Sequence, residues 1–539
     1  MIQFITVITP LRSWNIKSNA SHSSKIVIDL SSFDALESNS FDIIITFSER
    51  IAEFRDHDYT WKKCNATYIA NQFSPKIVKL ENGQIVQANL TNGIWEMSHK
   101  VPTVLFWRFN PENAAPLASY LGNENRKTIY QARQKFDFTE MPALLFPKNE
   151  PVEVSRSRIP FSAIACFTDH CDFDTAENLS LQREFFNEHQ IKITKGFFLN
   201  HFSKREDNAS YQNQKGELLK WKESGHELCY HSLSQSLKSN EKSFEDFKQF
   251  TPPFSKIKVW IDHGFQPYNF SLLRKGILTD REFEQVLQDK KIVTLWNYID
   301  SGTATTGVLN QFDTRHFTLS SFYKGNKDLG LIKKIQLIVK NIIFHYYNDE
   351  NLIFKYRLTV FNFKKLFFQK NLKSFFPLVN ESLKLGVSIL SVLLFWNTKK
   401  NRPYKLAKYS PIVFKHTIAE EEFYVFQTLE ILDFKKSLAP KNIKKLIRDS
   451  GVFIAHTYFS VPMHYHKGRM FSTPAIIDRE VFENFKFLGD KIKSNEIWNP
   501  TLTELIEYWS GFEKLIFDID HEGNLFEKSN TGLQIRKAI

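Results

Sequence analysis

From Phe161 onward, short apolar runs alternate with helix-like stretches, and this alternation is the strongest constraint on the fold. The run FSAIACF is followed by a helix-like stretch, AENLSLQREFFNEH, and then by another apolar run, IKITKGFFL. Strands that alternate with helices indicate βα units, which pack into a parallel sheet or barrel. Such folds carry their ligand-handling residues just past the carboxyl ends of the strands. The sequence therefore predicts an α/β fold of the (β/α) barrel kind, with a site at one end.

Polar side chains follow five of these strand-like runs. Because the carboxyl ends of parallel barrel strands meet at one rim, we expect these side chains to converge on one site. They are Asp169 and His170 after AIACFT, His231 after GHELCY, Asp262 and His263 after KIKVWI, Asp300 after IVTLWNYI, and His456 after GVFIA.

The same patterns divide the chain into four predicted parts. The first part has apolar strand-like runs, such as KIVIDL and TVLFWRF, separated by polar stretches, and it predicts a mixed α/β domain of unknown role. A linker rich in proline and charge then precedes the barrel. The parts are the N-terminal domain over 1–150, the first part of the barrel over 151–330, an insertion over 331–408, and the last part of the barrel with a tail over 409–539.

The positive charge of the chain is concentrated in the insertion. The whole chain has 71 Lys and Arg against 59 Asp and Glu, whereas residues 331–408 have 15 against 3, which accounts for the entire excess of 12. The segment also carries 14 aromatic residues. A basic, aromatic, helix-like segment is typical of peripheral contact with an anionic membrane, and a helical insertion with a solvated basic face is the alternative. Nucleic acid is not expected as a partner, because no known binding motif accompanies the charge.

Three features lead us to expect a cytoplasmic protein, and if the insertion contacts a membrane, we expect that contact to be peripheral and at the inner membrane face. The uncharged stretch 385–398 has 14 residues, fewer than the roughly 20 that a spanning helix needs. The first residues lack the basic region and the cleavage site of a secretory signal. The 4 cysteines form no CxxC pair, which argues against a disulfide scaffold.

The stretch GHELCYHSLSQS, residues 225–236, falls about one βα unit after CFTDH. It resembles the second motif of polysaccharide deacetylases of the NodB-homology type, the carbohydrate esterase family 4 group, which reads GHE, a short spacer and His-Ser/Thr-x-x-His. The resemblance covers about 161–323 and 411–520. It implies a distorted (β/α) barrel of that type, and an enzyme that removes an acetyl group from a sugar of a surface polysaccharide or its lipid-linked precursor.

The resemblance assigns roles to the residues after the first barrel strand. In the family, this strand ends in two aspartates, of which one is the general base and the other a metal ligand. Here Asp169 takes the place of the base and His170 the place of the ligand, with Asp172 and Asp174 close by as substitutes. Histidine and carboxylate are both competent ligands for zinc-like ions, so metal binding is still expected.

The second and third motifs depart from the family pattern. Gln235 stands where the second ligand histidine is expected, and an amide oxygen is a poor ligand for zinc. The third motif usually supplies an arginine, but Asp262 and His263 stand there, and His263 can supply the missing nitrogen. The resemblance thus implies a divalent metal of the zinc type, held by His170 or Asp172, His231 and His263.

The last motif of the family places a general acid after an apolar strand, and His456 holds that position. His464 and His466 in MHYHKG are a second local option. In the implied mechanism, Asp169 takes a proton from metal-bound water, the metal stabilises the oxyanion, and His456 protonates the leaving group.

Two other functions stay open at this point. The glutamine at position 235 and the missing arginine favour a barrel that has lost hydrolysis and binds a glycan or a partner. A metal-independent glycoside hydrolase would instead use carboxylates such as Asp169, Asp172 and Asp300. That chemistry requires two carboxyl groups about 5 to 10 Å apart across a sugar-sized cleft.

Overall fold

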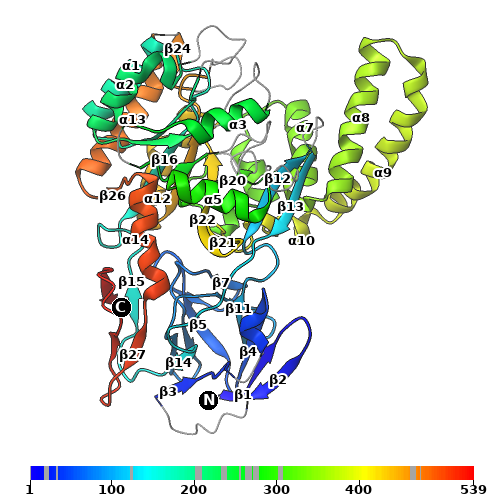
Figure 1. The fold of residues 1–539 in the computed structure, drawn as a ribbon. Coiled ribbons are helices and arrows are strands. Elements are labelled where there is room, and N and C mark those ends of the chain that lie inside the picture. The colour runs from blue at the N-terminus through cyan, green and yellow to red at the C-terminus, as the bar shows by residue number, and fades with distance from the viewer. Residues whose placement is uncertain are drawn as a thin grey trace.

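The structure of the protein is a computed structural model, shown in Figure 1. The barrel and its helices form one part of the molecule, the N-terminal strands lie below them, and a long helical hairpin projects from the barrel side. The structure describes residues 2–16, 24–31, 34–121, 126–200, 209–231, 240–253, 256–261, 270, 278–300, 307–461, 469–473 and 475–538.

Within the described residues, seven parallel strands close into a barrel. Their order around the barrel is β16, β17, β18, β19, β20, β22 and β23, and β23 pairs back with β16. The predicted (β/α) barrel is confirmed, although no finding places it in the NodB type. The strands are β16 (Ala163–Asp169), β17 (Thr194–Phe197), β18 (Glu227–Tyr230), β19 (Val259–Trp260), β20 (Thr294–Asp300), β22 (Glu421–Glu430) and β23 (Val452–Thr457).

The barrel strands are buried on both faces, which explains their continuous apolar runs. In β16, Ala165 and Phe167 pack into a cluster that includes helix residues, whereas Ile164 and Cys166 pack with residues of the other barrel strands. Side chains alternate along a strand, so one set faces the helices and the other fills the barrel. The surrounding helices include α1 (Ala176–Glu188), α2 (Tyr211–Glu223), α3 (Asn240–Gln249), α5 (Asp280–Lys290), α12 (Pro440–Arg448), α13 (Arg479–Lys493) and α14 (Leu502–Lys514).

The N-terminal part is built from two six-stranded sheets that share one apolar core. The orders are β2-β1-β4-β11-β10-β7 and β3-β14-β9-β8-β5-β6, whereas the hairpin of β12 (Pro116–Leu121) and β13 (Arg126–Gln131) lies against barrel strand β20 (Figure 1). The strands are β1 (Ile2–Ile8), β2 (Ser13–Ile16), β3 (Lys25–Val27), β4 (Phe41–Phe47), β5 (Ile51–Arg55), β6 (Trp61–Lys63), β7 (Tyr68–Ala70), β8 (Ile77–Leu80), β9 (Ile85–Ala88), β10 (Ile94–Met97), β11 (Val104–Phe109) and β14 (Ala143–Leu145).

The expected mixed α/β character of residues 1–150 is therefore wrong. In the described part of this range, the helical structure is a single 3-10 turn, η1 (Asp34–Glu37). One of the polar stretches between the strands is a tight turn. Asn82 and Gly83 join β8 to β9, and Gly83 has a φ of +87°, a conformation that glycine adopts without steric cost.

The insertion is helical, as its pattern predicts, and it follows α6 (Leu319–Gly325). One helical segment, Leu372–Leu394, is long and apolar enough to cross a membrane by length and composition alone, and 11% of its apolar window is buried. This helical segment is longer than the uncharged stretch 385–398, because it begins already at Leu372. It therefore includes Glu381 and Lys384, which form an ion pair. The elements are α7 (Leu331–Asn341), the π-helix η4 (Ile342–Tyr347), α8 (Glu350–Phe368), η5 (Leu372–Ser374), α9 (Phe375–Leu394), α10 (Trp396–Lys399) and η6 (Lys405–Ala407).

A buried carboxylate joins the N-terminal part, the linker and the C-terminal residues. Glu153 lies in β15 (Val152–Val154), which pairs with β29 (Ile535–Lys537). The Glu153 carboxylate accepts hydrogen bonds from Arg55 Nε at 2.8 Å and from Arg536 Nε at 2.7 Å. Its side chain is fully buried, so both arginines are needed to compensate the lost hydration.

We predict that Glu153→Ala lowers the free energy of unfolding by about 3–5 kcal/mol, because it leaves the buried Arg55 without its carboxylate. Urea denaturation measures the change. Glu150→Ala is the matched control, since the Glu150 side chain is exposed and pairs with Lys537 at 3.4 Å. An equal loss in both variants would contradict the prediction.

Candidate functional site

Three predicted metal ligands meet at the carboxyl end of the barrel. His170 and Asp172 follow β16, and His231 follows β18. One ligand atom from each of the three lies within 4.8 Å of the others, and all three residues are buried. The strand-end rule that placed them in the sequence therefore describes their real arrangement.

The spacing of these atoms suits a metal with short bonds. His231 Nε2 is 2.9 Å from His170 Nδ1 and 3.8 Å from Asp172 Oδ2. Zinc bonds of about 2.0–2.1 Å in tetrahedral geometry separate the ligand atoms by roughly 3.4 Å, which lies between these two values. Two nitrogens and one carboxylate oxygen are also a donor set that zinc accepts. The three residues therefore fit a divalent metal.

His456 lies against the same cluster. It is opposite Thr168 in the register of β16 with β23, and its ring stacks on His170 with centroids 3.8 Å apart. The ring centroids of Tyr458 and His456 are 4.7 Å apart. Unlike the buried histidines, Tyr458 is partly exposed. Tyr458 thus gives the site an aromatic surface that solvent reaches.

The predicted base Asp169 does not belong to this histidine cluster. It stands opposite Lys195 in the register of β16 with β17, and the Lys195 ammonium donates to its carboxylate. Lys195 also contacts Asp174 Oδ2 at 2.6 Å and donates to Gln182 Oε1 at 2.9 Å. Ser460 completes the group by donating to Asp174 Oδ1 at 2.7 Å. Asp169 and Asp174 are therefore counter-ions of a buried lysine.

Burial acts on the pKa values of both Asp169 and Lys195. It raises the pKa of Asp169 to about 7, although Lys195 acts against that rise. Burial also acts to lower the pKa of Lys195, but the two carboxylates outweigh it and raise that pKa above its ordinary value. Lys195 is thus held as an ammonium, and Asp169 lies beside it as its buried partner.

A glycine allows the two groups to sit close together. Gly196 follows Lys195 in β17, and a Cβ at this position would be 2.7 Å from the Asp169 carbonyl oxygen and 3.2 Å from His231 Cδ2. Contacts this short require the strand or the histidine to shift. The residue type at this position therefore sets how near His231 can approach β16.

Several predicted site residues lie outside the described residues. These are Gln235, Asp262, His263, His464 and His466, and the same holds for the side chain of Asp300, whose backbone ends β20. The predicted replacement of Gln235 by His263 stays a prediction.

The sequence analysis missed two charged residues of the barrel. Lys195 lies inside the apolar run IKITKGFFL, at a position of β17 whose side chain is buried, whereas Lys192 of the same run is partly exposed. Glu430 ends β22 and is opposite His456 in the register of β22 with β23. The strand-end rule could have found Glu430, because it follows the apolar run FYVFQTL.

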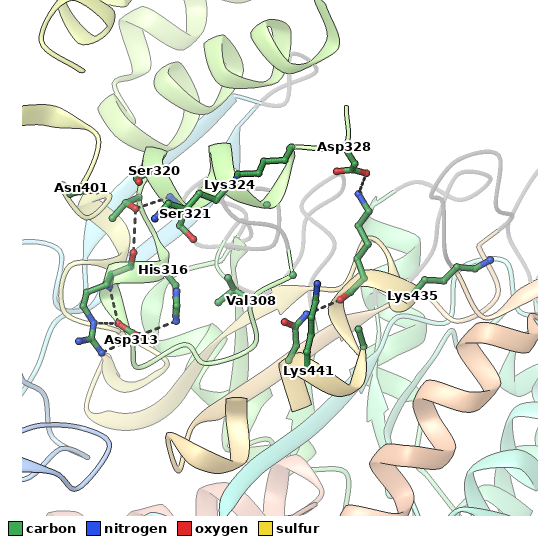
Figure 2. Close-up of a pocket in the computed structure, with 18 of the residues that line it drawn as sticks. Val308, Asp313, His316, Ser320, Ser321, Lys324, Asp328, Asn401, Lys435 and Lys441 are labelled. Atoms are coloured by element: carbon green, nitrogen blue, oxygen red, sulfur yellow. Dashed lines mark hydrogen bonds and ion pairs between the residues drawn. The ribbon is translucent and has the colours of Figure 1, made fainter. Parts of the chain in front are cut away.

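A separate cavity of about 1180 Å³ is lined by residues of α6 and α12 and by Asn401 near the end of the insertion, and Figure 2 shows this lining. None of the three clustered metal-ligand candidates lines it. Many of its charges are paired: Lys436 with Asp328, Lys435 with Asp478 at 2.8 Å, and His316 with Asp313 at 3.0 Å. Because paired surface charges leave little reactive chemistry, we assign the candidate active site to the histidine cluster.

No protein-family model and no curated protein matches the chain. Among solved structures, the galactosidase domain of an alpha-galactosidase-sucrose kinase matches with a TM-score of 0.20 and 10% identity, over 48% of this chain and 42% of that one. A GH36 alpha-galactosidase from Geobacillus stearothermophilus matches with a TM-score of 0.21 and 8% identity, over 48% and 43%. A Flavobacterium johnsoniae GH31 dextranase matches with a TM-score of 0.25 and 7% identity, over 93% and 65%. The chain spans less than half of both galactosidase chains and just under two thirds of the dextranase.

The expected carbohydrate deacetylase is wrong. The solved structures reported above are glycoside hydrolases and not deacetylases.

We predict that Lys195→Met lowers the free energy of unfolding by about 3–5 kcal/mol, because Asp169 and Asp174 lose their buried cation. Lys192→Met is the matched control three positions earlier, where Lys192 is 45% exposed and pairs with Glu504. Surface pairs contribute at most about 1 kcal/mol, so the control should unfold nearly as the wild type does in urea. Similar losses in both variants would refute the assignment.

We also predict that Gly196→Ala lowers the melting temperature, because the added methyl group meets Asp169 and His231. Gly216→Ala in α2 is the control, since a Cβ there has no neighbour within 4 Å. Alanine is better than glycine in a helix by about 1 kcal/mol, so the control should melt at the same temperature or higher. A Gly196→Ala variant that melts with the wild type would show that the strand yields easily.

Proposed function

We propose that the chain is a carbohydrate-active hydrolase of the glycoside hydrolase class, with its active site at the carboxyl end of the barrel. The observation that carries the proposal is the convergence of His170, Asp172 and His231 within 4.8 Å of one another. Buried polar side chains that converge at a barrel rim are costly to maintain without a function. This is also the end at which barrel enzymes place their catalytic residues.

We propose in addition that His170, Asp172 and His231 hold a divalent metal of the zinc type. A metal bound there would act as a Lewis acid and lower the pKa of a bound water. The two imidazoles must both offer lone pairs to it, so metal binding would remove the proton that His231 and His170 share across their 2.9 Å contact.

The other residues of the site would serve the sugar and its leaving group. Hydrolysis of a glycosidic bond needs a proton donor for the departing oxygen. Among the described residues, His456 beside His170 and Glu430 on the adjacent strand are placed for this role. Tyr458 offers a partly exposed ring, a surface of the kind that packs against the apolar face of a sugar.

A carbohydrate presented at a membrane, such as a lipid-linked glycan, is the substrate form that we propose. Support comes from the insertion, which carries the net positive charge of the chain. Anionic lipid head groups attract such segments, which would bring the barrel close to its substrate.

The test combines metal analysis with hydrolysis assays on the full chain. We expect the purified protein to bind zinc with one site per chain, and to release sugar from a panel of aryl glycosides and oligosaccharides. His170→Ala and His231→Ala should lose the metal and reduce turnover by about 100-fold or more, because each removes a ligand. His521→Ala, at a position whose side chain is 91% exposed, is the control and should keep both properties.

The outcomes separate the two parts of the proposal. Glycoside hydrolysis that survives removal of the metal would refute the metal site and leave the hydrolase. Zinc binding without hydrolysis of any glycoside in the panel would refute the hydrolase and leave the metal site.

A further inference from the structure

The helical hairpin of α8 and α9 carries far less buried side-chain surface than the other long helices. It stands away from the barrel in Figure 1. No side chain of α8 is buried, and α9 buries only Leu385 and Val392. By contrast, the shorter helix α14 buries five residues, among them Trp509. A helix pair of this length has therefore found no protein surface for its apolar side chains.

The exposed apolar residues of α9 and the turn before it form one continuous stripe. They recur every three or four positions, which places them on one face of a helix. At 1.5 Å per residue, the 23 residues of this segment extend over about 35 Å. The stripe consists of Leu372 (81% exposed), Phe376 (78%), Val379 (40%), Leu383 (67%), Val387 (72%), Leu390 (55%) and Leu394 (77%).

Helix α8 and the turn add a second apolar surface next to this stripe. Phe361, Phe367 and Phe368 are 52%, 61% and 79% exposed, and Phe375 at the start of α9 is 49% exposed. Large contiguous apolar patches on soluble proteins mark interaction surfaces. The question is what covers this one.

The charge of the hairpin indicates which kind of partner covers this apolar surface. Residues 350–394, which form the hairpin, have 7 basic and 2 acidic residues, so two hairpins packed side by side would repel each other. An anionic bilayer attracts the same charges, and it also buries Phe and Leu at the boundary of its acyl chains. The apolar stripe and the positive charge are thus complementary to one partner, a negatively charged lipid surface.

The position of the lysines decides how the hairpin lies in the lipid. Lys364, Lys365, Lys370 and Lys373 surround the turn between α8 and α9. A hairpin that crossed the bilayer would have to carry these four charges through the hydrocarbon, which is strongly unfavourable. Lying in the plane of the interface, the same lysines reach the head groups while the stripe faces the acyl chains.

We propose that the α8–α9 hairpin is a monotopic membrane anchor, which lies in the interface of an anionic bilayer with the α9 stripe buried in the acyl chains. This anchor does not depend on the chemistry at the barrel, and each can fail without the other. It holds the barrel at the lipid surface on the side from which the hairpin projects.

The experiment measures co-sedimentation of the full chain with vesicles of phosphatidylcholine, alone or mixed with phosphatidylglycerol. We expect binding to the mixed vesicles, and a loss of at least about tenfold in the variant Leu383→Gln/Val387→Gln/Leu390→Gln, since apolar burial drives insertion. The matched control is Leu11→Gln/Val101→Gln/Ile476→Gln, three exposed apolar residues elsewhere, of which Leu11 is 85% exposed. It should bind as the wild type does, and circular dichroism should show both variants folded.

A second variant tests the charge, and two results would overturn the proposal. Lys364→Gln/Lys365→Gln/Lys370→Gln/Lys373→Gln should lose its preference for the phosphatidylglycerol vesicles. Failure of the wild type to bind these vesicles at low salt would refute the anchor. So would a wild-type dimer in light scattering that the α9 triple variant converts to a monomer, because a second copy would then cover the stripe.

Discussion

The buried ammonium of Lys195 is the interaction on which the barrel site depends. A charged group in the interior must be paired, and here the pairing draws partners from several elements. Asp169 ends β16, Asp174 belongs to the loop that follows it, Gln182 lies in α1, and Ser460 follows β23. One cation thereby fixes both ends of the loop at 170–173. His170 and Asp172 lie in that loop, so the Lys195 ion pair helps to place them beside His231.

Much of the barrel could be predicted because both its strands and its site follow one rule. Buried parallel strands are apolar throughout, so FSAIACF, GHELCY and GVFIA are visible as strands without an alignment. The residues after them are polar because they face the rim. The N-terminal part was harder, since short antiparallel strands and the turns between them have no period long enough to exclude a helix. The glycine turn at Gly83 was the local signal for a hairpin.

The sequence could predict which positions lie at the candidate site, but it could not predict which side chains contact one another there. The positions of His170, Asp172 and His231 follow from strand ends, but the sequence does not show which acid faces a cation. Asp169 and Asp172 are three residues apart, and only the register of β16 with β17 puts the first of them opposite Lys195. Register is a long-range property of the sheet, so a role carried over from a motif cannot determine it. The insertion was the reverse case, because its composition gave its basic and aromatic character and its helix-like pattern gave its secondary structure.

The pairing of β15 with β29 has a consequence for how the chain is made. Glu153 and Arg536 are 383 residues apart in sequence, so at ribosomal rates of about 5–20 residues per second the partner strand arrives roughly 20 to 80 seconds later. During that interval, Arg55 is already available to Glu153, but β15 lacks β29, the strand with which it forms a two-stranded sheet. The nascent chain therefore passes through a long period in which its linker presents an open edge, and chaperones have that time in which to bind it.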